Sequence, residues 1–123
     1  MVIDSSVFIE HLRAKDKTQT TLANLPLSTT PYVTAVTWYE LYMGASTPSK
    51  WSDVENLLNP LPVLIFDKAV AAKAALIYQD LQKIHQAIDH RDIFIAATAL
   101  VHNLPLKTLN IRHFNRITDL IIL

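Results

Sequence analysis

The chain has 123 residues, a usual length for one domain with a single core, and we expect one domain over residues 1–123. Half of the residues are hydrophobic and 11 basic side chains balance 11 acidic ones, which excludes a disordered or strongly charged chain. The absence of cysteine excludes disulfides and thiol chemistry, and the single glycine, Gly44, is too little for a P-loop, a dinucleotide fingerprint or a nucleophile elbow.

Short β-branched or aliphatic runs alternate along the chain with segments of helical spacing. Because apolar and polar residues do not alternate within these runs, we expect strands that are buried on both faces. The gaps between the strands leave room for parallel crossovers, except for the last gap, so the pattern predicts an α/β fold. The expected strands are Met1–Ile3, Tyr32–Val36, Pro62–Phe66, Leu104–Thr108 and Leu120–Leu123, and the expected helices include Trp38–Ala45, Trp51–Leu58 and Val70–Ile84.

The segment Ile93–Val101 is apolar nearly all round, which predicts a helix packed beneath others. Asn103 and Pro105 mark its expected end. The segment is far shorter than the ~20 apolar residues that span a membrane. The start of the chain has no basic region typical of a secretory signal, so we expect a cytoplasmic protein.

Three acidic residues, Asp4, Glu40 and Asp92, lie in apolar sequence and differ in this from the other acids. Asp4 ends the first strand, Glu40 lies one turn into the helix after the second strand, and Asp92 opens the buried helix. In a parallel α/β sheet, all three positions can meet at the carboxyl edge. Buried carboxylates repel one another, so such a cluster usually binds a hard divalent cation.

The same acids are also placed as helix caps. Thr37–Glu40 has the pattern of a capping box, Asp4 can cap the first helix, and Asp89 can cap the helix in which Asp92 takes the third position. Asp67 follows a strand in the same way, and we assign it to capping. The spacing of these residues leaves a capping role and a metal-binding role open.

Four segments resemble a known family. They read M-V-I-D-S-S-V-F-I-E, T-W-Y-E-L-Y-M-G-A, D-I-F-I-A-A-T-A-L and L-K-T-L-N-I-R-H-F, and they follow one another through the whole chain. Together they resemble the PIN-domain ribonucleases of the VapC toxin type. The resemblance implies a parallel five-stranded sheet of order 3-2-1-4-5 between helices. It further implies a pocket that binds Mg²⁺ or Mn²⁺, and endonucleolytic cleavage of RNA by the toxin of a type II toxin–antitoxin pair.

Asp4, Glu40 and Asp92 match the three acids of the family, so the resemblance implies that they are catalytic and bind the metal. Hydrolysis of a phosphodiester needs an activated water and neutralised phosphate charge, both of which divalent cations supply. The family often has a glycine a few residues before the third acid, where this chain has His85, so the shape of that loop is expected to differ.

Ser6, Thr108 and Asn110 are the candidate substrate-binding residues, through contacts to phosphate or water. Many relatives carry a fourth acid after the fourth strand, whereas this chain has Thr108, Asn110 and His113 there. That departure leaves the second metal position open.

The resemblance also implies a VapB-type antitoxin as partner and a homodimer. Because the net charge is zero, RNA contacts must come from local basic side chains. The candidates are Arg13, Lys15, Lys17, Arg112 and Arg116. Aromatic side chains at helical spacing fit an antitoxin groove or the core equally well; they are Trp38, Tyr39, Tyr42 and Trp51.

Two other functions are compatible with the sequence. A PIN-like scaffold that binds RNA or a partner without cutting is compatible with the missing fourth acid. A magnesium-binding phosphoacceptor receiver domain could use Asp4 and Asp67, but it needs paired acids at the first strand and a lysine after the fifth, where this chain ends in Ile121–Leu123. A metal-dependent cleavage assay with Asp92→Asn as control distinguishes these functions.

Overall fold

The computed structural model describes all residues from 1 to 123, and helices follow strands through most of the chain. None of the helices combines the length and the hydrophobicity that a membrane-spanning helix needs. The elements are β1 Val2–Ile3, α1 Ser5–Arg13, η1 Lys17–Gln19, β2 Val33–Thr34, α2 Ala35–Gly44, α3 Pro48–Leu58, β3 Val63–Leu64, α4 Lys68–Lys83, α5 His90–Val101, β4 Leu106–Lys107 and α6 Ile111–Phe114.

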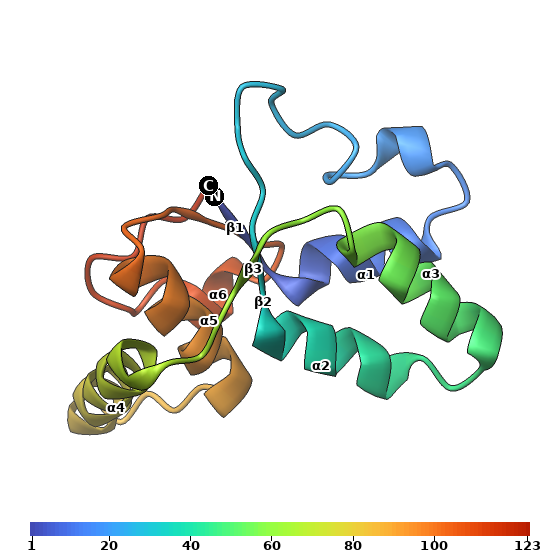
Figure 1. The fold of residues 1–123 in the computed structure, drawn as a ribbon. Coiled ribbons are helices and arrows are strands. Elements are labelled where there is room, and N and C mark those ends of the chain that lie inside the picture. The colour runs from blue at the N-terminus through green and yellow to red at the C-terminus, as the bar shows by residue number, and fades with distance from the viewer.

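The strands form two short parallel pairs at the centre of the molecule (Figure 1). β1 pairs with β4, with Val2 opposite Leu106, and β2 pairs with β3. An isolated parallel bridge from Val2 to Tyr32 connects the two pairs, and another connects Leu106 to Ile122. The α/β class is therefore confirmed, whereas the continuous five-stranded sheet implied by the resemblance is seen only as two-residue strands and bridges.

Prolines and helix caps limit the strands to two residues each. Pro62 and Pro105 directly precede β3 and β4 and have no N–H to donate to a ladder. Thr34 ends β2 and is also the N-cap of α2, where its hydroxyl accepts the N–H of Thr37 at 3.1 Å. The predicted strand Tyr32–Val36 is therefore too long, because α2 begins directly after Thr34.

Two hydrophobic cores lie on opposite sides of the strands. Successive residues of a strand point to opposite faces, and Val2 and Ile3 of β1 accordingly belong to different cores. Val2 packs with residues of α4, α5 and α6, and Ile3 packs with residues of α1, α2 and α3. Figure 1 shows these two groups of helices on the two sides of the strands.

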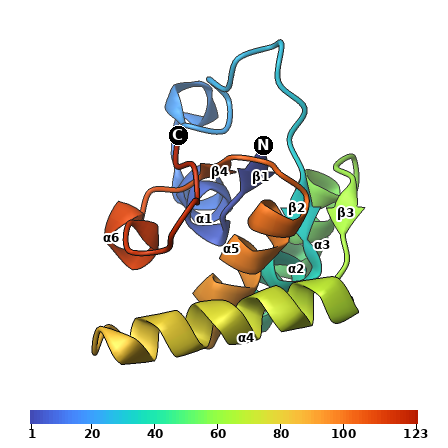
Figure 2. The same cartoon turned by 90° about the vertical axis from the view of Figure 1, so that its left-hand side faces the viewer.

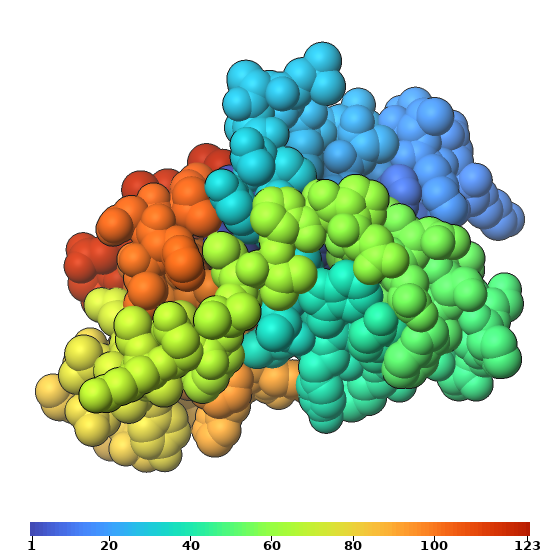
Figure 3. Space-filling model, in the orientation of Figure 1, coloured from blue at the N-terminus to red at the C-terminus, as the bar shows by residue number.

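The prediction that Pro62–Phe66 is buried on both faces is wrong. Val63 is 45% exposed, Ile65 64% and Phe66 44%. The reason is that β3 pairs only with β2 and so lies at an edge. Figure 3 shows the yellow-green segment around β3 crossing the surface of the molecule.

Helix α5 has the buried position that its composition predicts. Ile93 and every residue from 95 to 99 are buried, and α4 lies across this helix (Figure 2). The helix ends at Val101, and Asn103 follows with a φ of 53°, in agreement with the predicted end. The predicted helix Val70–Ile84 is also confirmed as α4, except that Ile84 lies beyond the end of this helix and is 54% exposed.

His85, in the loop between α4 and α5, has a φ of 55°, in the left-handed region that favours glycine. His85→Gly should therefore stabilise the protein by up to about 1 kcal/mol, which raises the melting temperature by up to about 4 °C. The neighbouring change Gln86→Gly should lower the melting temperature, because the φ of Gln86 is not positive. Thermal denaturation of both variants checks this, and equal shifts would contradict it.

Candidate active site

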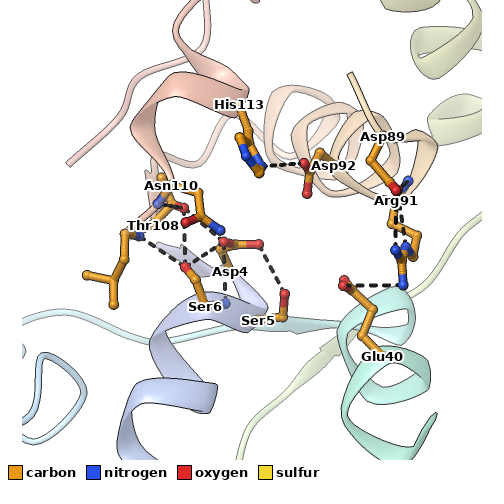
Figure 4. Close-up of polar contacts among 11 residues, drawn as sticks. Asp4, Ser5, Ser6, Glu40, Asp89, Arg91, Asp92, Thr108, Asn110 and His113 are labelled. Carbon is orange, nitrogen blue, oxygen red and sulfur yellow. Dashed lines mark hydrogen bonds and ion pairs between the residues drawn. The ribbon is translucent and has the colours of Figure 1, made fainter. Parts of the chain in front are cut away.

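A cleft of about 480 Å³ lies between α1, α2, α5 and the segment that follows β4. Its lining is mostly polar, with Ile9 and Leu109 as the only two hydrophobic residues among 12. Glu40 and Asp92 line it, and Asp4 lies close by in Figure 4. The structure thus brings the three acids from apolar sequence to the same edge, at the carboxyl ends of β1, β2 and β4.

Asp4 is 1% exposed, and its carboxylate accepts hydrogen bonds from one hydroxyl group close by in the sequence and from another far along the chain. Its Oδ2 accepts the hydroxyl of Ser6 at 2.7 Å and the hydroxyl of Thr108 at 2.8 Å (Figure 4). The same oxygen accepts the N–H of Ser6 at 3.4 Å, so Asp4 is also the N-cap of α1. The capping prediction is confirmed for Asp4, and capping leaves the carboxylate at the site.

The three predicted substrate-binding residues take different positions. Asn110 and Ser6 line the cleft, and the hydroxyl of Ser6 also accepts the N–H of Leu109 at 3.0 Å. Thr108 is only 3% exposed, and its hydroxyl donates to Asp4 and accepts the N–H of Asn110 at 2.9 Å. Thr108 is therefore placed to hold Asp4 and the following loop, and not to reach a substrate.

Glu40 projects from the second turn of α2, and the predicted capping box Thr37–Glu40 is wrong because Thr34 caps this helix. Its Oε1 is buried without a hydrogen-bond partner, and its Oε2 lies 4.0 Å from Nη1 of Arg91. Burial raises the pKa of Glu40, and the charge of Asp4 raises it further, while Arg91 opposes the shift.

Asp92 is the third residue of α5, and Asp89 caps this helix by accepting the N–H of Arg91 at 2.8 Å, as predicted. The Oδ2 of Asp92 lies 2.9 Å from Nδ1 of His113. Burial raises the pKa of Asp92, and the negative charge of Asp4 adds to this, while His113 opposes it. Asp92 therefore does not cap the helix, and it faces the cleft beside His113.

Arg91 is the residue of the cleft that the sequence analysis missed. Its Nε and Nη2 lie 3.1 and 3.2 Å from the two carboxylate oxygens of Asp89, and its Nη1 faces Glu40 (Figure 4). The available signal was a basic residue between two acids at the start of a buried helix. Sequence alone does not distinguish that pattern from a solvated helix end.

Of the five basic residues predicted to contact RNA, only Arg13 lines this cleft. Lys17 instead donates to three carbonyls at the end of α1, at 2.7 to 3.2 Å. Arg116 lines a different cleft beside α4. Lys15 and Arg112 are exposed.

The aromatic side chains divide between core and surface. Trp38 and Tyr42 pack against the core beside α1, α2 and α3, and Tyr42 stacks on Trp51 with ring centroids 3.9 Å apart. Trp51 is 43% exposed and Tyr39 55% exposed. Two of the four aromatics are therefore available at the surface.

The acids of the cleft fit a hard divalent cation by their chemistry. Their donors are carboxylate oxygens, the atoms that Mg²⁺ and Mn²⁺ prefer. Oε1 of Glu40 is buried and unpartnered, and burial together with the charge of Asp4 raises the pKa of both Glu40 and Asp92. As the side chains stand, no three His, Asp or Glu residues are close enough to hold one ion. Arg91 and His113 are the partners of Glu40 and Asp92 instead.

The raised pKa of Glu40 predicts a pH-dependent effect of Glu40→Gln on stability. An ionised Glu40 disfavours the folded state. This penalty grows as the pH rises above 4.5, the ordinary pKa of a glutamate, and through the raised pKa of Glu40 in the folded state. Glutamine has no charge at any pH. Without divalent cations, the melting temperature of the variant minus that of the parent should therefore become more positive from about pH 4 to pH 8.

Asp80→Asn is the control for this titration, because Asp80 is exposed, lies on α4 and lines no cleft together with Glu40. Its difference from the parent measures the effect of the same acid-to-amide change away from the cleft. Thermal denaturation at a series of pH values measures both differences. A Glu40→Gln difference that falls as the pH rises contradicts the electrostatic account of the cleft.

The similarity to known proteins extends over nearly the whole chain. The family model of the PIN domain matches residues 1–120. Ribonuclease VapC1 of Methanocaldococcus jannaschii is 30% identical over 120 residues, which cover 97% of this chain and 82% of that protein. Ribonuclease VapC10 of Mycobacterium tuberculosis is 32% identical over 118 residues, which cover 93% of this chain and 85% of that protein.

Solved structures agree with this likeness. A chain in the crystal structure of DNA-bound VapBC from Salmonella typhimurium superposes with a TM-score of 0.87 at 25% identity. The match covers 99% of this chain and 95% of that chain. The fold and the order of its elements are therefore shared along the full length.

Proposed function

Since this chain belongs to the PIN domain family and is related to the VapC ribonucleases within it, we propose that it is a divalent-metal-dependent endoribonuclease and the toxin of a toxin–antitoxin pair. The observation that carries the proposal is the buried Asp4, which lies beside the polar cleft that Glu40 and Asp92 line. Three carboxylates with this burial are costly for stability, so a catalytic use explains them better than a structural one.

Asp4, Glu40 and Asp92 are the residues that would hold Mg²⁺ or Mn²⁺ in this cleft. When bound, the cation supplies a water of lowered pKa and neutralises charge on the transferring phosphate. This chain lacks the fourth acid that many relatives carry, and Asn110 and His113 line the part of the cleft formed by the segment after β4. We propose one well-bound cation there rather than two.

The remaining side chains of the cleft orient the acids and the substrate. Thr108 and Ser6 fix the carboxylate of Asp4 through their hydroxyls, and His113 fixes that of Asp92. Asn110 and Ser6 both line the cleft. The side-chain amide of Asn110 would donate to a phosphate or water, whereas Ser6, whose hydroxyl hydrogen goes to Asp4, would accept from a water. Arg13 adds positive charge on the same wall, which the neutral chain needs in order to attract RNA.

The finer topology is part of the same proposal. The bridges from Val2 to Tyr32 and from Leu106 to Ile122 support a sheet of order 3-2-1-4-5, in which the segment around Ile122 is the fifth strand. This order puts β1 in the centre, so Asp4 leaves the sheet beside the ends of β2 and β4.

A cleavage assay tests the proposed activity. The purified chain should cut RNA internally with Mn²⁺ or Mg²⁺, and EDTA should stop the reaction. Binding of RNA without cutting, under any of these cations, would instead favour the non-cleaving scaffold. The cation requirement and the internal position of the cuts together distinguish this nuclease from an exonuclease contaminant.

A VapB-type antitoxin is the expected partner, and the solved relatives include VapBC complexes. Co-expressed with the neighbouring gene, the chain should purify with a small protein bound and should cut RNA only after that protein is removed. Size-exclusion chromatography and a cleavage assay before and after denaturing separation measure this. A fully active nuclease in the co-purified complex would contradict it. The homodimer and the cytoplasmic location stay predictions.

A further inference from the structure

Building on the proposed function, we infer that Arg91 is a built-in counter-cation that competes with the divalent metal ion for Glu40. By this competition, Arg91 sets the metal affinity of the cleft. Arg91 acts through Glu40 and is therefore a positioning residue.

The geometry of Arg91 divides its guanidinium between two acids. Nε and Nη2 form a two-point pair with Asp89, and the backbone N–H of Arg91 donates to the same carboxylate. The third nitrogen, Nη1, is left facing Glu40 at 4.0 Å. A planar guanidinium can serve both acids at once, which a lysine ammonium cannot do with the same geometry. Figure 4 shows this arrangement on the wall of the cleft.

Glu40 has Arg91 as its only ion-pair partner. Burial raises the pKa of Glu40, the charges of Asp4 and Asp92 raise it further, and the hydroxyl of Ser5 lowers it. Its Oε1 has no hydrogen-bond partner. A cation that approached Glu40 would gain from the charges of all three acids. Arg91 already supplies part of the neutralisation that such a cation would bring.

The contact between Arg91 and Glu40 is weak enough to be displaced. The side chain of Arg91 is 41% exposed, and the 4.0 Å separation is at the long end for an ion pair. A partly exposed pair of this kind changes an equilibrium by a factor of up to about five. A divalent ion on Glu40 would also repel Nη1, while the two-point pair with Asp89 keeps the rest of the guanidinium in place.

Competition has a reciprocal consequence. If a bound metal ion weakens the contact between Arg91 and Glu40, then removal of that contact must strengthen metal binding by the same factor. Arg91→Gln should therefore bind Mn²⁺ more tightly than the parent, by up to about fivefold. Arg91→Lys keeps the charge without the two-point geometry, and its dissociation constant should lie between those of the parent and Arg91→Gln.

Arg13→Gln is the matched control. Arg13 lines the same cleft and carries the same charge, but it forms no ion pair with any acid. Its removal changes the general field of the cleft, which salt at about 0.15 M screens over roughly 8 Å. The Mn²⁺ dissociation constant of Arg13→Gln should therefore stay within about twofold of the parent value.

The experiment is isothermal titration of Mn²⁺ into the four proteins, each as the chain of 123 residues, freed of metal with EDTA and dialysed. The melting temperature of each is also measured with EDTA and with saturating Mn²⁺. Arg91→Gln should melt below the parent in EDTA, because Glu40 loses its neutralising partner, and should approach the parent in Mn²⁺. A merely structural role of Arg91 would lower both melting temperatures alike and leave the dissociation constant unchanged.

The outcomes separate this competition from the proposed function. If the parent and Arg91→Gln bind Mn²⁺ with the same dissociation constant, the proposed role of Arg91 is wrong and the nuclease proposal is unaffected. Equal tightening in Arg13→Gln and Arg91→Gln overturns it as well, since general charge would then explain the effect. No binding of Mn²⁺ by any of the proteins overturns the metal-dependent function, and the role of Arg91 with it.

Discussion

Asp4→Asn, Glu40→Gln and Asp92→Asn should each reduce RNA cleavage at least about a hundredfold while the protein stays folded. Each amide keeps the shape of the acid and removes the charge that holds a cation. Asparagine at position 4 also remains a good N-cap for α1. Initial rates of cleavage with saturating Mn²⁺ measure the loss, and circular dichroism with thermal denaturation checks the fold.

Asp67→Asn is the matched control for these variants. Asp67 also follows a strand, and its carboxylate accepts the N–H of Val70 at 3.0 Å as the N-cap of α4, as predicted. Because Asp67 does not line the acidic cleft, its variant should cleave RNA at the parent rate. Parent-like cleavage by any of the three cleft variants would show that the changed residue is not catalytic.

Divalent cations should raise the melting temperature of the parent by several degrees. A cation that binds only the folded state stabilises it by about 2.7 kcal/mol at a hundredfold excess over its dissociation constant. In a domain of this size, this corresponds to a shift of roughly 10 °C. Melting curves with EDTA, millimolar Mg²⁺ and millimolar Mn²⁺ at moderate salt measure the shift. A melting temperature that does not respond to either cation would exclude a metal site in this cleft.

Asp92→Asn should change both the stability of the metal-free protein and its response to metal ions. Burial and the charge of Asp4 raise the pKa of Asp92, so the ionised side chain disfavours the folded state at neutral pH. The metal-free variant should therefore be no less stable than the parent, although it loses the contact with His113. Its response to Mn²⁺ should shrink. If the acids served only as helix caps, the parent would show no response to metal at all.

The sequence by itself determined the local features of this protein. The helices α2 to α5 and the ends of α5 follow from side-chain spacing and from residues such as Asn103, because these signals act within a few residues along the chain. The acids of the cleft were recognisable for the same reason, since Asp4 and Asp92 are charged residues within apolar sequence. Capping by Asp89 and Asp67 could also be predicted locally.

Only the tertiary structure decided which groups the acids contact. Asp4 is held by the hydroxyl of Thr108, which lies 104 positions away, and a contact at that separation leaves no local pattern in the sequence. The capping box at Thr37–Glu40 failed because Thr34 starts the helix earlier, which frees the carboxylate of Glu40 for the cleft.

The tertiary structure also decided the neighbours of the site and the exposure of the strands. Arg91 reaches Glu40 from another helix, so its part in the cleft depends on how α2 and α5 pack. The apolar run around β3 is exposed because that strand has one neighbour instead of two. Local sequence sets which residues form an element and which carry charge, whereas burial and electrostatic pairing depend on the packing of elements that are distant in the chain.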